Sequence, residues 1–493
     1  MTHGMCGQSP VRQPSSLTKA EHEIFCKHLI RMFLRLLLLV IIFKVSMSQS
    51  IIQTLPGFSG NLPFKLETGY IGVGKLDEVQ LFYYFIESER NPRDDLLLLW
   101  LTGGPGCSTF SGLVYEIGPL TFNYNNSRGT KPTFKLNPYS WTKVANIIFL
   151  DQPVGTGFSY ATKAEGYNTS DTSSAAQTYE FLRKWLMVHP EFLSNPLYIS
   201  GDSYSGITVP IIVQEVLNGL HIGHQPPMNL QGYILGNPVT DAEYDFNSRI
   251  LFAYRKALVS KSLYESTKRN CKGEYTTPDP NDTACMSYLQ AVTQCLGNLD
   301  EAQILEPNCE RLSPKPKRAK WDHRSLGDSS LAVLLSTPQS TELWCRNYHY
   351  LYSYVWANDK TVRSALHIRE GTIGEWLRCN GSLSYDYDVS TSIDYERNLT
   401  REQLRALIYS GDHDMVIPYL GTIAWIESFN LTVQVDWYPW LVDGQVAGYN
   451  MNYAEEKYSL TYATIKGGGH TAPEYKPNEA LAMIERWLAH FPL

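Results

Sequence analysis

Short apolar runs alternate with amphipathic stretches along most of this chain. The apolar runs are four to seven residues long, a length typical of buried strands. Two of the intervening stretches, Ser173–Val188 and Ile207–Leu220, carry the spacing of helices. The alternation predicts an α/β protein whose central sheet is covered by helices on both faces. The predicted strands are Gln80–Ile86, Leu96–Leu101, Asn146–Leu150, Leu197–Ser200, Gly232–Leu235, Ala406–Tyr409 and Tyr462–Ile465.

Residues 243–342 interrupt this alternation. The segment contains four cysteines, short helical pieces and the basic run Lys315–Lys320, which is typical of an exposed loop. We interpret it as an insertion that caps the site. The chain then divides into an N-terminal extension and signal peptide (1–48), a first part of the core (49–242), a cap insertion with an exposed linker (243–342) and a second part of the core (343–493).

The N-terminal region has the features of a secretory signal. Arg31 and Arg35 flank an apolar stretch, Leu36–Phe43, and small residues follow it up to a cleavage site near Ser48. An uncleaved signal anchor is the alternative, although the apolar stretch is short for a membrane span. Entry into the secretory pathway would expose six sequons to glycosylation, at Asn125, Asn168, Asn281, Asn380, Asn398 and Asn430.

Composition and the absence of certain motifs argue against several other functions. The net charge is −7, so nothing suggests a nucleic-acid partner. Histidines are scattered without the spacing of metal ligands, and no coenzyme fingerprint is present. The glycine-rich loop at Gly103 lacks the Lys-Ser/Thr of a phosphate-binding loop. We therefore expect neither a metal nor a cofactor.

The segment Gly201–Gly206 is the strongest candidate for chemistry. It reads Gly-Asp-Ser-Tyr-Ser-Gly, and it joins a predicted strand to a predicted helix. A serine in such a turn is typical of a nucleophile elbow, in which Ser203 projects from a strained backbone toward substrate. The strict pattern requires glycine at position 205, where this chain has serine.

A nucleophilic serine needs a base and an acid that orients the base. Asp412 follows the strand Ala406–Tyr409, and His470 follows the strand Tyr462–Ile465. The order Ser, Asp, His is that of α/β-hydrolases, and the ends of strands are where open α/β sheets carry their sites. Taken singly, Asp412 could be a turn or capping residue and His470 a surface histidine.

Five segments together resemble the serine carboxypeptidase-like proteins of plants. They are Trp100–Ser108, Leu150–Tyr160, the Ser203 elbow, Tyr409–Asp414 and Gly467–Thr471. The resemblance implies an α/β-hydrolase fold, with a mixed, mostly parallel sheet flanked by helices and a helical cap insertion. It also implies a triad of Ser203, His470 and Asp412. The oxyanion hole would consist of the backbone N–H groups of Gly104 and Tyr204.

The cysteines outside the leader are expected to pair in an oxidising compartment. Spacing favours the local bridges Cys271–Cys285 and Cys295–Cys309. The family resemblance adds Cys107–Cys345, which would leave Cys379 free. It also favours the vacuole lumen over the cell exterior. Since some relatives are cut in their linker, we hypothesise a cut within 313–340.

Two positions address the kind of acyl chemistry. True carboxypeptidases of the family have Asn-Gly-Gly-Pro-Gly and Gly-Glu-Ser-Tyr, and the Asn and Glu, with a further acid, hold the peptide's terminal carboxylate. Here Thr102 replaces the Asn, Asp202 replaces the Glu, and the further acid corresponds to Glu116. Together with Gly103, these are the expected substrate contacts. The combination resembles the acyltransferase branch of the family.

The resemblance therefore implies transfer of an acyl group from a 1-O-acyl-β-glucose ester to an alcohol acceptor, through an acyl-enzyme on Ser203. The partners would be these small molecules. Two alternatives stay open. One is a carboxypeptidase that releases C-terminal residues of peptides in an acidic compartment, and the other is a catalytically silent binding protein. Thr102 could equally be a strand terminus, and Asp202 a turn residue.

Overall fold

The computed structural model describes residues 48–124, 131–309 and 345–493. The predicted signal peptide, the sequon at Asn125, the basic run Lys315–Lys320 and the hypothetical cut within 313–340 lie outside these residues. Nearly all described residues belong to one compact unit, Gln49–Leu493.

A twelve-stranded mixed sheet forms the centre of the described part of this unit. Its order is β1-β2-β3-β7-β4-β10-β11-β13-β16-β15-β14, with β8 paired to β3. Neighbours from β7 to β16 are parallel, whereas both outer parts are antiparallel. All seven predicted strands are present. The strands are β1 (Ser48–Thr54), β2 (Asn61–Val73), β3 (Val79–Ile86), β4 (Leu96–Leu101), β7 (Ala145–Leu150), β8 (Tyr160–Ala161), β10 (Leu197–Asp202), β11 (Leu230–Gly236), β13 (Arg405–Gly411), β14 (Thr432–Val442), β15 (Gln445–Glu455) and β16 (Tyr458–Ile465).

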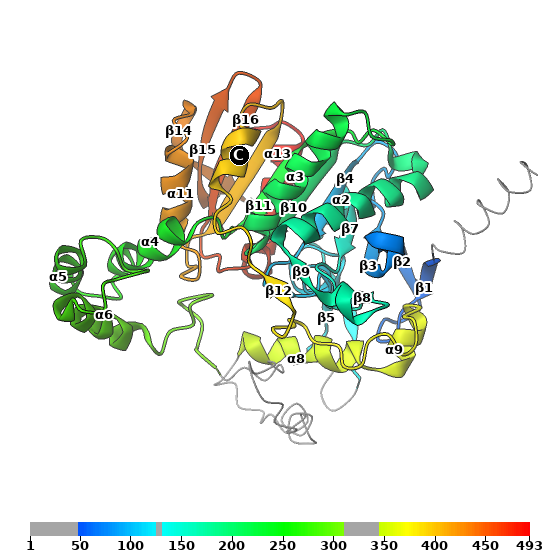
Figure 1. Ribbon diagram of the computed structural model, residues 1–493, viewed down its shortest axis with the longest axis horizontal. Coiled ribbons are helices and arrows are strands. Elements are labelled where there is room, and N and C mark those ends of the chain that lie inside the picture. The colour runs from blue at the N-terminus through cyan, green and yellow to red at the C-terminus, as the bar shows by residue number, and fades with distance from the viewer. Residues whose placement is uncertain (1–47, 125–130, 310–344) are drawn as a thin grey trace, which may run out of the picture. The chain divides into compact units, whose positions relative to one another are not determined.

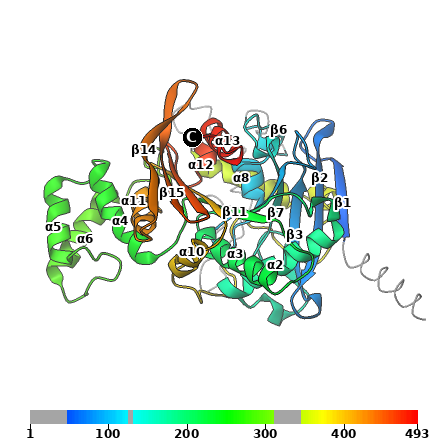
Figure 2. The same ribbon diagram turned by 90° about the horizontal axis from the view of Figure 1, so that it is seen from above.

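Helices cover both faces of this sheet (Figures 1 and 2). Figure 2 shows α2, α3 and α10 on one face and α12 and α13 on the other. The fold is thus the predicted α/β-hydrolase architecture, a mixed and mostly parallel sheet flanked by helices. The helices are α2 (Asp171–Val188), α3 (Ser205–His221), α4 (Ala242–Arg255), α5 (Lys261–Cys271), α6 (Thr283–Leu296), α8 (Arg346–Ala357), α9 (Lys360–Ala365), α10 (Ile393–Leu399), α11 (Tyr419–Glu427), α12 (Ala472–Tyr475) and α13 (Pro477–Leu488). Short two- and three-residue strands complete the list: β5 (Leu120–Phe122), β6 (Phe134–Leu136), β9 (Thr169–Ser170) and β12 (Tyr385–Asp386).

The long connection between β11 and β13 has two different parts. Helices α4, α5 and α6 have an apolar cluster of their own, around Ile250, Val259, Tyr264 and Val292, and α5 and α6 extend away from the sheet in Figure 1. Helices α8 and α9 instead contribute Tyr352, Trp356 and Val362 to the main core. The predicted division at 342/343 separates these two parts and stays a prediction.

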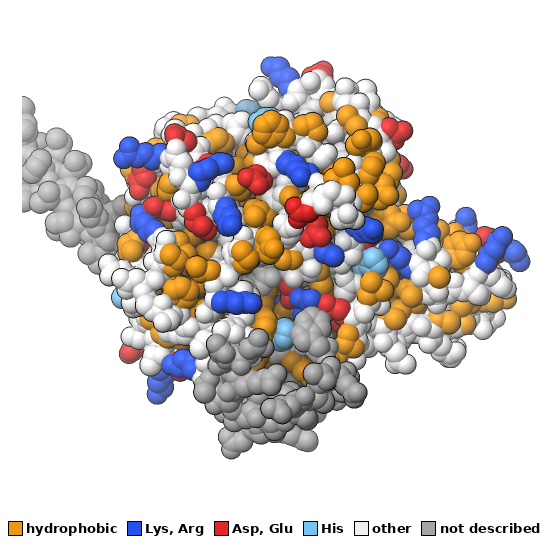
Figure 3. Space-filling model, turned by 180° about the vertical axis from the view of Figure 1, so that it is seen from behind, with side chains coloured by type: hydrophobic (Ala, Val, Ile, Leu, Met, Phe, Trp, Pro, Cys, Tyr) orange, Lys and Arg blue, Asp and Glu red, His pale blue; other side chains and the backbone are white. Residues whose placement is uncertain are grey.

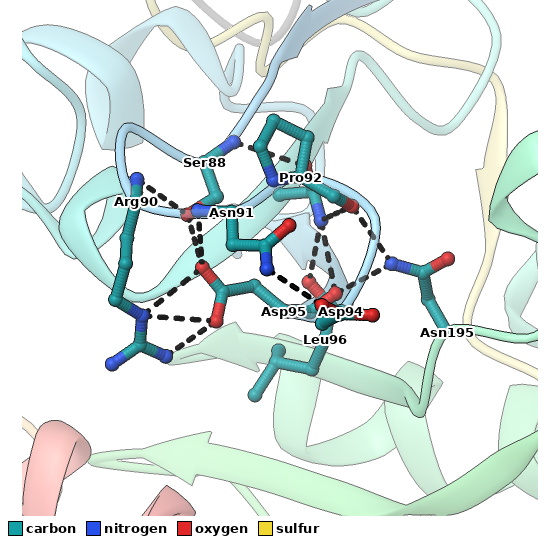
Figure 4. A network of polar contacts seen from close by, with 9 residues as sticks. Ser88, Arg90, Asn91, Pro92, Asp94, Asp95, Leu96 and Asn195 are labelled. Atoms are coloured by element: carbon teal, nitrogen blue, oxygen red, sulfur yellow. Dashed lines mark hydrogen bonds and ion pairs between the residues drawn. The ribbon is translucent and has the colours of Figure 1, made fainter.

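A polar network fixes the ends of β4 and β10 that lie opposite the candidate site (Figure 4). The Asp95 carboxylate accepts hydrogen bonds from Ser88 Oγ at 2.5 Å and from the backbone N–H of Asn91 at 3.1 Å. The Asn195 amide donates to the carbonyls of Pro92 and Asp95 at 2.9 and 2.6 Å. Because it pairs backbone groups that the core would otherwise leave unsatisfied, the network stabilises the loop before β4.

Several carboxyl groups are buried, and this predicts a stability that falls as the pH rises. Burial raises the pKa of Glu396 to about 8, that of Asp245 to about 7 and that of Asp151 to about 6. When the pKa of a group is higher in the folded than in the unfolded state, its contribution to stability is fully present at pH values below the unfolded-state pKa. That contribution is lost as the pH rises through the folded-state pKa. We expect the melting temperature to fall by roughly 5 °C between pH 5 and pH 8.

The contribution of Glu396 can be isolated. Its Oε2 accepts a hydrogen bond from the Tyr233 hydroxyl at 2.5 Å. Glutamine retains this hydrogen bond but has no group that titrates. Glu396→Gln should therefore flatten the decline above pH 6 in a thermal-unfolding series, and the exposed Glu485→Gln should leave it unchanged. An identical slope in all three proteins would contradict this account.

Candidate active site

Four adjacent parallel strands end at the same edge of the sheet. In the register of these strands, Asp202 at the end of β10 pairs with Gly236 of β11, Gly236 pairs with Tyr409 of β13, and Gly411 pairs with Ile465 of β16. The residues that follow each strand therefore meet at this edge, which is where open α/β sheets carry their sites.

Ser203 occupies a sharp turn between β10 and α3. Its φ of 55° lies in the left-handed region, where a residue other than glycine is strained. Backbone hydrogen bonds hold the turn: Ser203 N–H donates to Gly236 O at 2.9 Å, and Val239 N–H donates to Ser203 O at 2.8 Å. The Gly103 loop lies so close that a Cβ on Gly103 would be 2.5 Å from Tyr204 N. The predicted elbow is therefore present, with Ser205 in place of glycine.

His470 connects Ser203 to an aspartate, but not to the predicted one. His470 Nε2 lies 2.8 Å from Ser203 Oγ, and Nδ1 lies 2.8 Å from Asp414 Oδ2. Asp412 instead contacts its neighbour His413, at 2.6 Å. The assignment of Asp412 as the partner of His470 is wrong because both aspartates lie in the same turn after β13 and only Asp414 points at the imidazole.

The environment of Asp414 explains why it orients the histidine. Its side chain is fully buried. Oδ2 also accepts a hydrogen bond from Asn237 Nδ2 at 2.8 Å, and Oδ1 accepts one from Val416 N–H at 2.7 Å. Burial lowers the pKa of His470, but the charge of Asp414, its hydrogen bond to the imidazole and the charge of Asp202 together outweigh burial and raise the pKa. Such an arrangement enables a histidine to take a proton from a serine hydroxyl.

Asn237 is a site residue that sequence reasoning missed. It follows β11 directly and its φ is 43°. While its amide nitrogen donates to Asp414, its amide oxygen accepts the N–H of Gly411 at 3.2 Å. The available signal was a polar residue at the end of a third neighbouring strand, the same signal that identified Asp412 and His470.

A cavity of about 520 Å³ opens beside Ser203. All four predicted substrate contacts line it, namely Thr102, Gly103, Glu116 and Asp202. The oxyanion-hole candidate Gly104, Ser203 and His470 line it as well. The other oxyanion-hole candidate, Tyr204, follows Ser203 directly, and its hydroxyl donates to Asp171 at 2.8 Å. The cavity is lined by Thr102, Gly103, Gly104, Pro105, Cys107, Glu116, Asp202, Ser203, Asp300, Ala302, Arg346, Asn347, Tyr350, Arg378, Cys379, Gly381, Val416, His470, Thr471 and Tyr475.

Two carboxyls share one wall of this cavity. Burial raises the pKa of Glu116 well above its usual value, and the charge of Asp202, to which it is hydrogen-bonded, raises it further. Burial also raises the pKa of Asp202, to about 6, although the nearby His470 opposes this. Asp202 Oδ1 accepts the N–H of Gly103 at 3.3 Å. The pair therefore keeps a proton to a higher pH than either carboxyl would alone, as closely spaced buried acids do.

Polar atoms without partners also line the cavity. Thr102 Oγ1 and Glu116 Oε2 are buried and have no hydrogen-bond partner among the described residues. The same is true of Arg378 Nε, whose guanidinium lies 4.0 Å from the ring centroid of Tyr350. Because an unpaired buried polar atom is costly, these three atoms mark places where a polar ligand would be stabilised.

A second cavity of about 530 Å³ adjoins the first. The two share Asp300, Ala302, Asn347 and Val416. The second is lined by side chains of α4 and α6, most of them apolar, including Phe246, Ile250, Leu289, Val292 and Leu296. The insertion therefore contributes an apolar wall to a cavity that adjoins the one beside Ser203.

The disulfides differ from the expected pattern in two of three cases. Cys271 is joined to Cys285, the pair that spacing predicts. Cys107 is joined to Cys379 rather than to Cys345, so Cys379 is not free. Cys345 is joined to Cys309, and Cys295 is an exposed free thiol. Spacing misled the pairing of Cys295 with Cys309, and the family resemblance misled the pairing of Cys107, because the fold brings Cys379 beside the Gly104 loop, where Cys107 and Cys379 form a β-bridge.

The described sequons differ in accessibility. Asn168, Asn281, Asn398 and Asn430 are exposed. Asn380 is half-buried, and its amide donates to Gly155 O at 2.9 Å. Glycosylation at all of them stays a prediction, with Asn380 the least accessible of the five.

The described residues contain no group of three or more His, Cys, Asp or Glu side chains that could hold a metal ion. No helix in this part of the chain is long and apolar enough to cross a membrane. On the face in Figure 3, acidic and basic side chains are interspersed among apolar ones.

Comparisons with known proteins agree with this geometry. The family described as Serine carboxypeptidase matches residues 56–490. Serine carboxypeptidase-like 2 of Arabidopsis thaliana is 50% identical over 90% of this chain and 94% of its own. Serine carboxypeptidase-like 17 of the same plant is 48% identical over 92% and 97%. A crystal structure of the prohormone-processing carboxypeptidase of Saccharomyces cerevisiae has a TM-score of 0.66 at 18% identity, and covers 87% of this chain and 91% of its own, which supports the fold.

Proposed function

Because this chain belongs to the serine carboxypeptidase family, we propose that Ser203, His470 and Asp414 catalyse acyl transfer from a 1-O-acyl-β-glucose ester to an alcohol. We favour a glucose ester as the substrate because of one observation. Beside Ser203, the buried Thr102 Oγ1 and Glu116 Oε2 have no hydrogen-bond partner within the part of the chain that the structure describes, and both residues line the cavity.

Sugar hydroxyls fit these unpaired atoms. A hydroxyl both donates and accepts, so it can pair with a threonine hydroxyl and with a carboxyl oxygen in either protonation state. Thr102 has no amide to donate to a peptide carboxylate, unlike the asparagine of the family's carboxypeptidases. Asp202 is shorter than glutamate by one methylene, or about 1.5 Å. The wall therefore suits a neutral polyhydroxyl group better than an anion.

The reaction would proceed in two steps. Ser203 Oγ attacks the ester carbonyl while His470 takes its proton, and the C–O bond to glucose breaks as His470 returns that proton to the leaving oxygen. Backbone N–H groups of Gly104 and Tyr204 stabilise the oxyanion. An acceptor hydroxyl then loses its proton to His470 and attacks the acyl-enzyme, which restores Ser203. The second cavity, one wall of which consists of apolar side chains of α4 and α6, offers space for the acyl group or the acceptor.

A carboxypeptidase activity is the second candidate, and Arg378 is the observation that favours it. Its guanidinium lines the cavity, and its Nε has no partner among the described residues. A guanidinium is a strong partner for a carboxylate. The Glu116–Asp202 pair could add a shared proton at acidic pH.

A paired assay distinguishes the two candidates. The secreted, glycosylated protein is given 1-O-hydroxycinnamoyl- and galloyl-glucose with a pool of alcohols in one arm, and N-blocked dipeptides in the other. Acyl transfer without peptide cleavage supports the proposal, and peptide cleavage without transfer establishes the second candidate. A lack of either activity, with no labelling of Ser203 by a fluorophosphonate probe, would support a silent binding protein.

Exchanging the two wall residues should shift the balance. The double variant Thr102→Asn, Asp202→Glu restores the carboxylate-binding pattern of the family. We expect peptide cleavage to rise by about tenfold and acyl transfer to fall by about tenfold. The reason is that one hydrogen bond to a charged group contributes about 1.5–3 kcal/mol. The ratio of the two kcat/KM values measures this. Thr361→Asn, at an exposed position on α9, is the matched control. An unchanged ratio would exclude the two side chains as determinants.

The compartment follows from the cysteines. Three disulfides among the described residues indicate a protein of the secretory pathway. Within that pathway we propose the vacuole lumen, because the buried carboxyls favour an acidic compartment.

A further inference from the structure

The turn that carries His470 is held from several sides. Residues Gly467–Gly469 join β16 to the histidine, and Gly467 has a φ of 75°. Gly468 O accepts the N–H of His413 at 2.9 Å, and Gly467 O accepts a hydrogen bond from Gln303 Nε2 at 3.0 Å. The backbone N–H of His470 donates to Ala302 O at 2.7 Å. The position of the imidazole thus depends on the backbone of a three-glycine turn, whose intrinsic freedom is large.

One side chain reaches this turn from the neighbouring strand end. Asp412 Oδ1 accepts the N–H of Gly467 at 2.6 Å and lies 2.6 Å from His413 Nδ1. Lys256, directly after α4, has its Nζ 3.9 Å from Oδ2. Burial raises the pKa of Asp412, but the hydrogen bond and charge of His413, the charge of Lys256 and the Gly467 N–H together outweigh burial, so the pKa lies below the usual value. The carboxylate is therefore ionised, and a charged acceptor makes a strong bond to an N–H.

We infer that Asp412 is a positioning residue, which holds the Gly467–Gly469 turn through Gly467 N–H and thereby keeps His470 Nε2 within reach of Ser203 Oγ. The inference rests on the proposed function only in taking Ser203 and His470 as the reacting pair. Asp412 touches neither of them directly. It differs from Asp414, which contacts the imidazole, because it acts on the backbone three residues before the histidine.

The test measures the reactivity of Ser203 without any natural substrate. The second-order rate of labelling by a fluorophosphonate probe is followed from pH 4 to 9. Asp412→Ala should lower the high-pH plateau by about 10- to 100-fold, since displacements near 1 Å at a reacting group have effects of this size. Asp412→Asn, whose amide oxygen still accepts the Gly467 N–H, should recover most of the loss, to within about fivefold of wild type.

The pH at which the labelling rate reaches half of its plateau distinguishes a positioning role of Asp412 from an effect of its charge on His470. The charges that act on His470 come from Asp414, Asp202 and Arg249, so both variants should retain the wild-type midpoint. With an active donor ester, kcat should fall while KM stays the same. His413→Ala removes the other partner of the same carboxylate and should change the plateau by less than about threefold.

Each outcome decides the matter. A wild-type plateau in Asp412→Ala overturns the inference while the proposed triad stands. Should the alanine variant not fold, Asp412→Leu, which has similar bulk but no acceptor, takes its place in this comparison. A loss in Asp412→Asn as large as the loss without any acceptor also overturns the inference. A shifted midpoint also overturns it, because Asp412 would then act through its charge on His470. If the wild-type protein itself fails to label at Ser203, the proposed function fails and this inference with it.

Discussion

Asp414→Asn is expected to lower kcat by about 10⁴-fold, while Asp412→Asn lowers it by no more than about fivefold. Asparagine fills the same space, but its amide can present an N–H to His470 Nδ1. The imidazole then adopts the tautomer that cannot accept the Ser203 proton. Loss of the Asp414 charge also removes the interaction that raises the pKa of His470.

The comparison of the two aspartates tests the assignment made from the structure. Both variants are measured with the same donor ester over a range of pH, alongside thermal unfolding. Because Asp414 is fully buried among Asn237, Val416 and His470, asparagine is preferred to alanine, which would leave a cavity. A large loss in Asp412→Asn with a small one in Asp414→Asn would reverse the assignment.

Ser203→Ala should lower turnover by about 10⁶-fold and abolish labelling by a fluorophosphonate. The nucleophile would be absent, whereas the backbone contacts of the elbow, Ser203 N–H to Gly236 O and Val239 N–H to Ser203 O, remain. The protein should therefore fold, and thermal unfolding should differ from wild type by only a few degrees. Turnover at the wild-type level would show that the chemistry does not pass through this serine.

The sheet was predictable because its signal is local. Leu96–Leu101 and Ala145–Leu150 are buried along almost their whole length, and a strand buried on both faces is apolar at every position. Ser203 and His470 could be found because each lies in a glycine-rich turn after such a strand. The antiparallel edges were harder: β14 is exposed at most of its positions, and its apolar run, Trp437–Val442, contains a proline, which argues against a strand.

The choice between Asp412 and Asp414 could not be made from the sequence. Two aspartates separated by one residue in a turn point in different directions, and that direction depends on backbone angles set by contacts such as Asp414 N–H to Gly411 O. The pairing of Cys295 with Cys309 failed for a related reason: short separations favour closure in an unfolded chain, whereas the folded chain joins Cys309 to Cys345. The pairing of Cys107 with Cys345 came from the family resemblance, and the folded chain instead joins Cys107 to Cys379, 272 residues away.

The bridge between Cys107 and Cys379 also orders the events of biosynthesis. The ribosome makes the first cysteine 272 residues before the second, which at about 5–20 residues per second is a delay of tens of seconds or less. During that time Cys107 lacks its native partner, and Cys271 and Cys285 are synthesised before Cys379 is. A bridge from Cys107 to either of them would have to be reversed by thiol exchange. The wall of the cavity that carries Gly104 is joined to Cys379 only after synthesis has passed residue 379, so a nascent chain that already has its serine has no finished pocket.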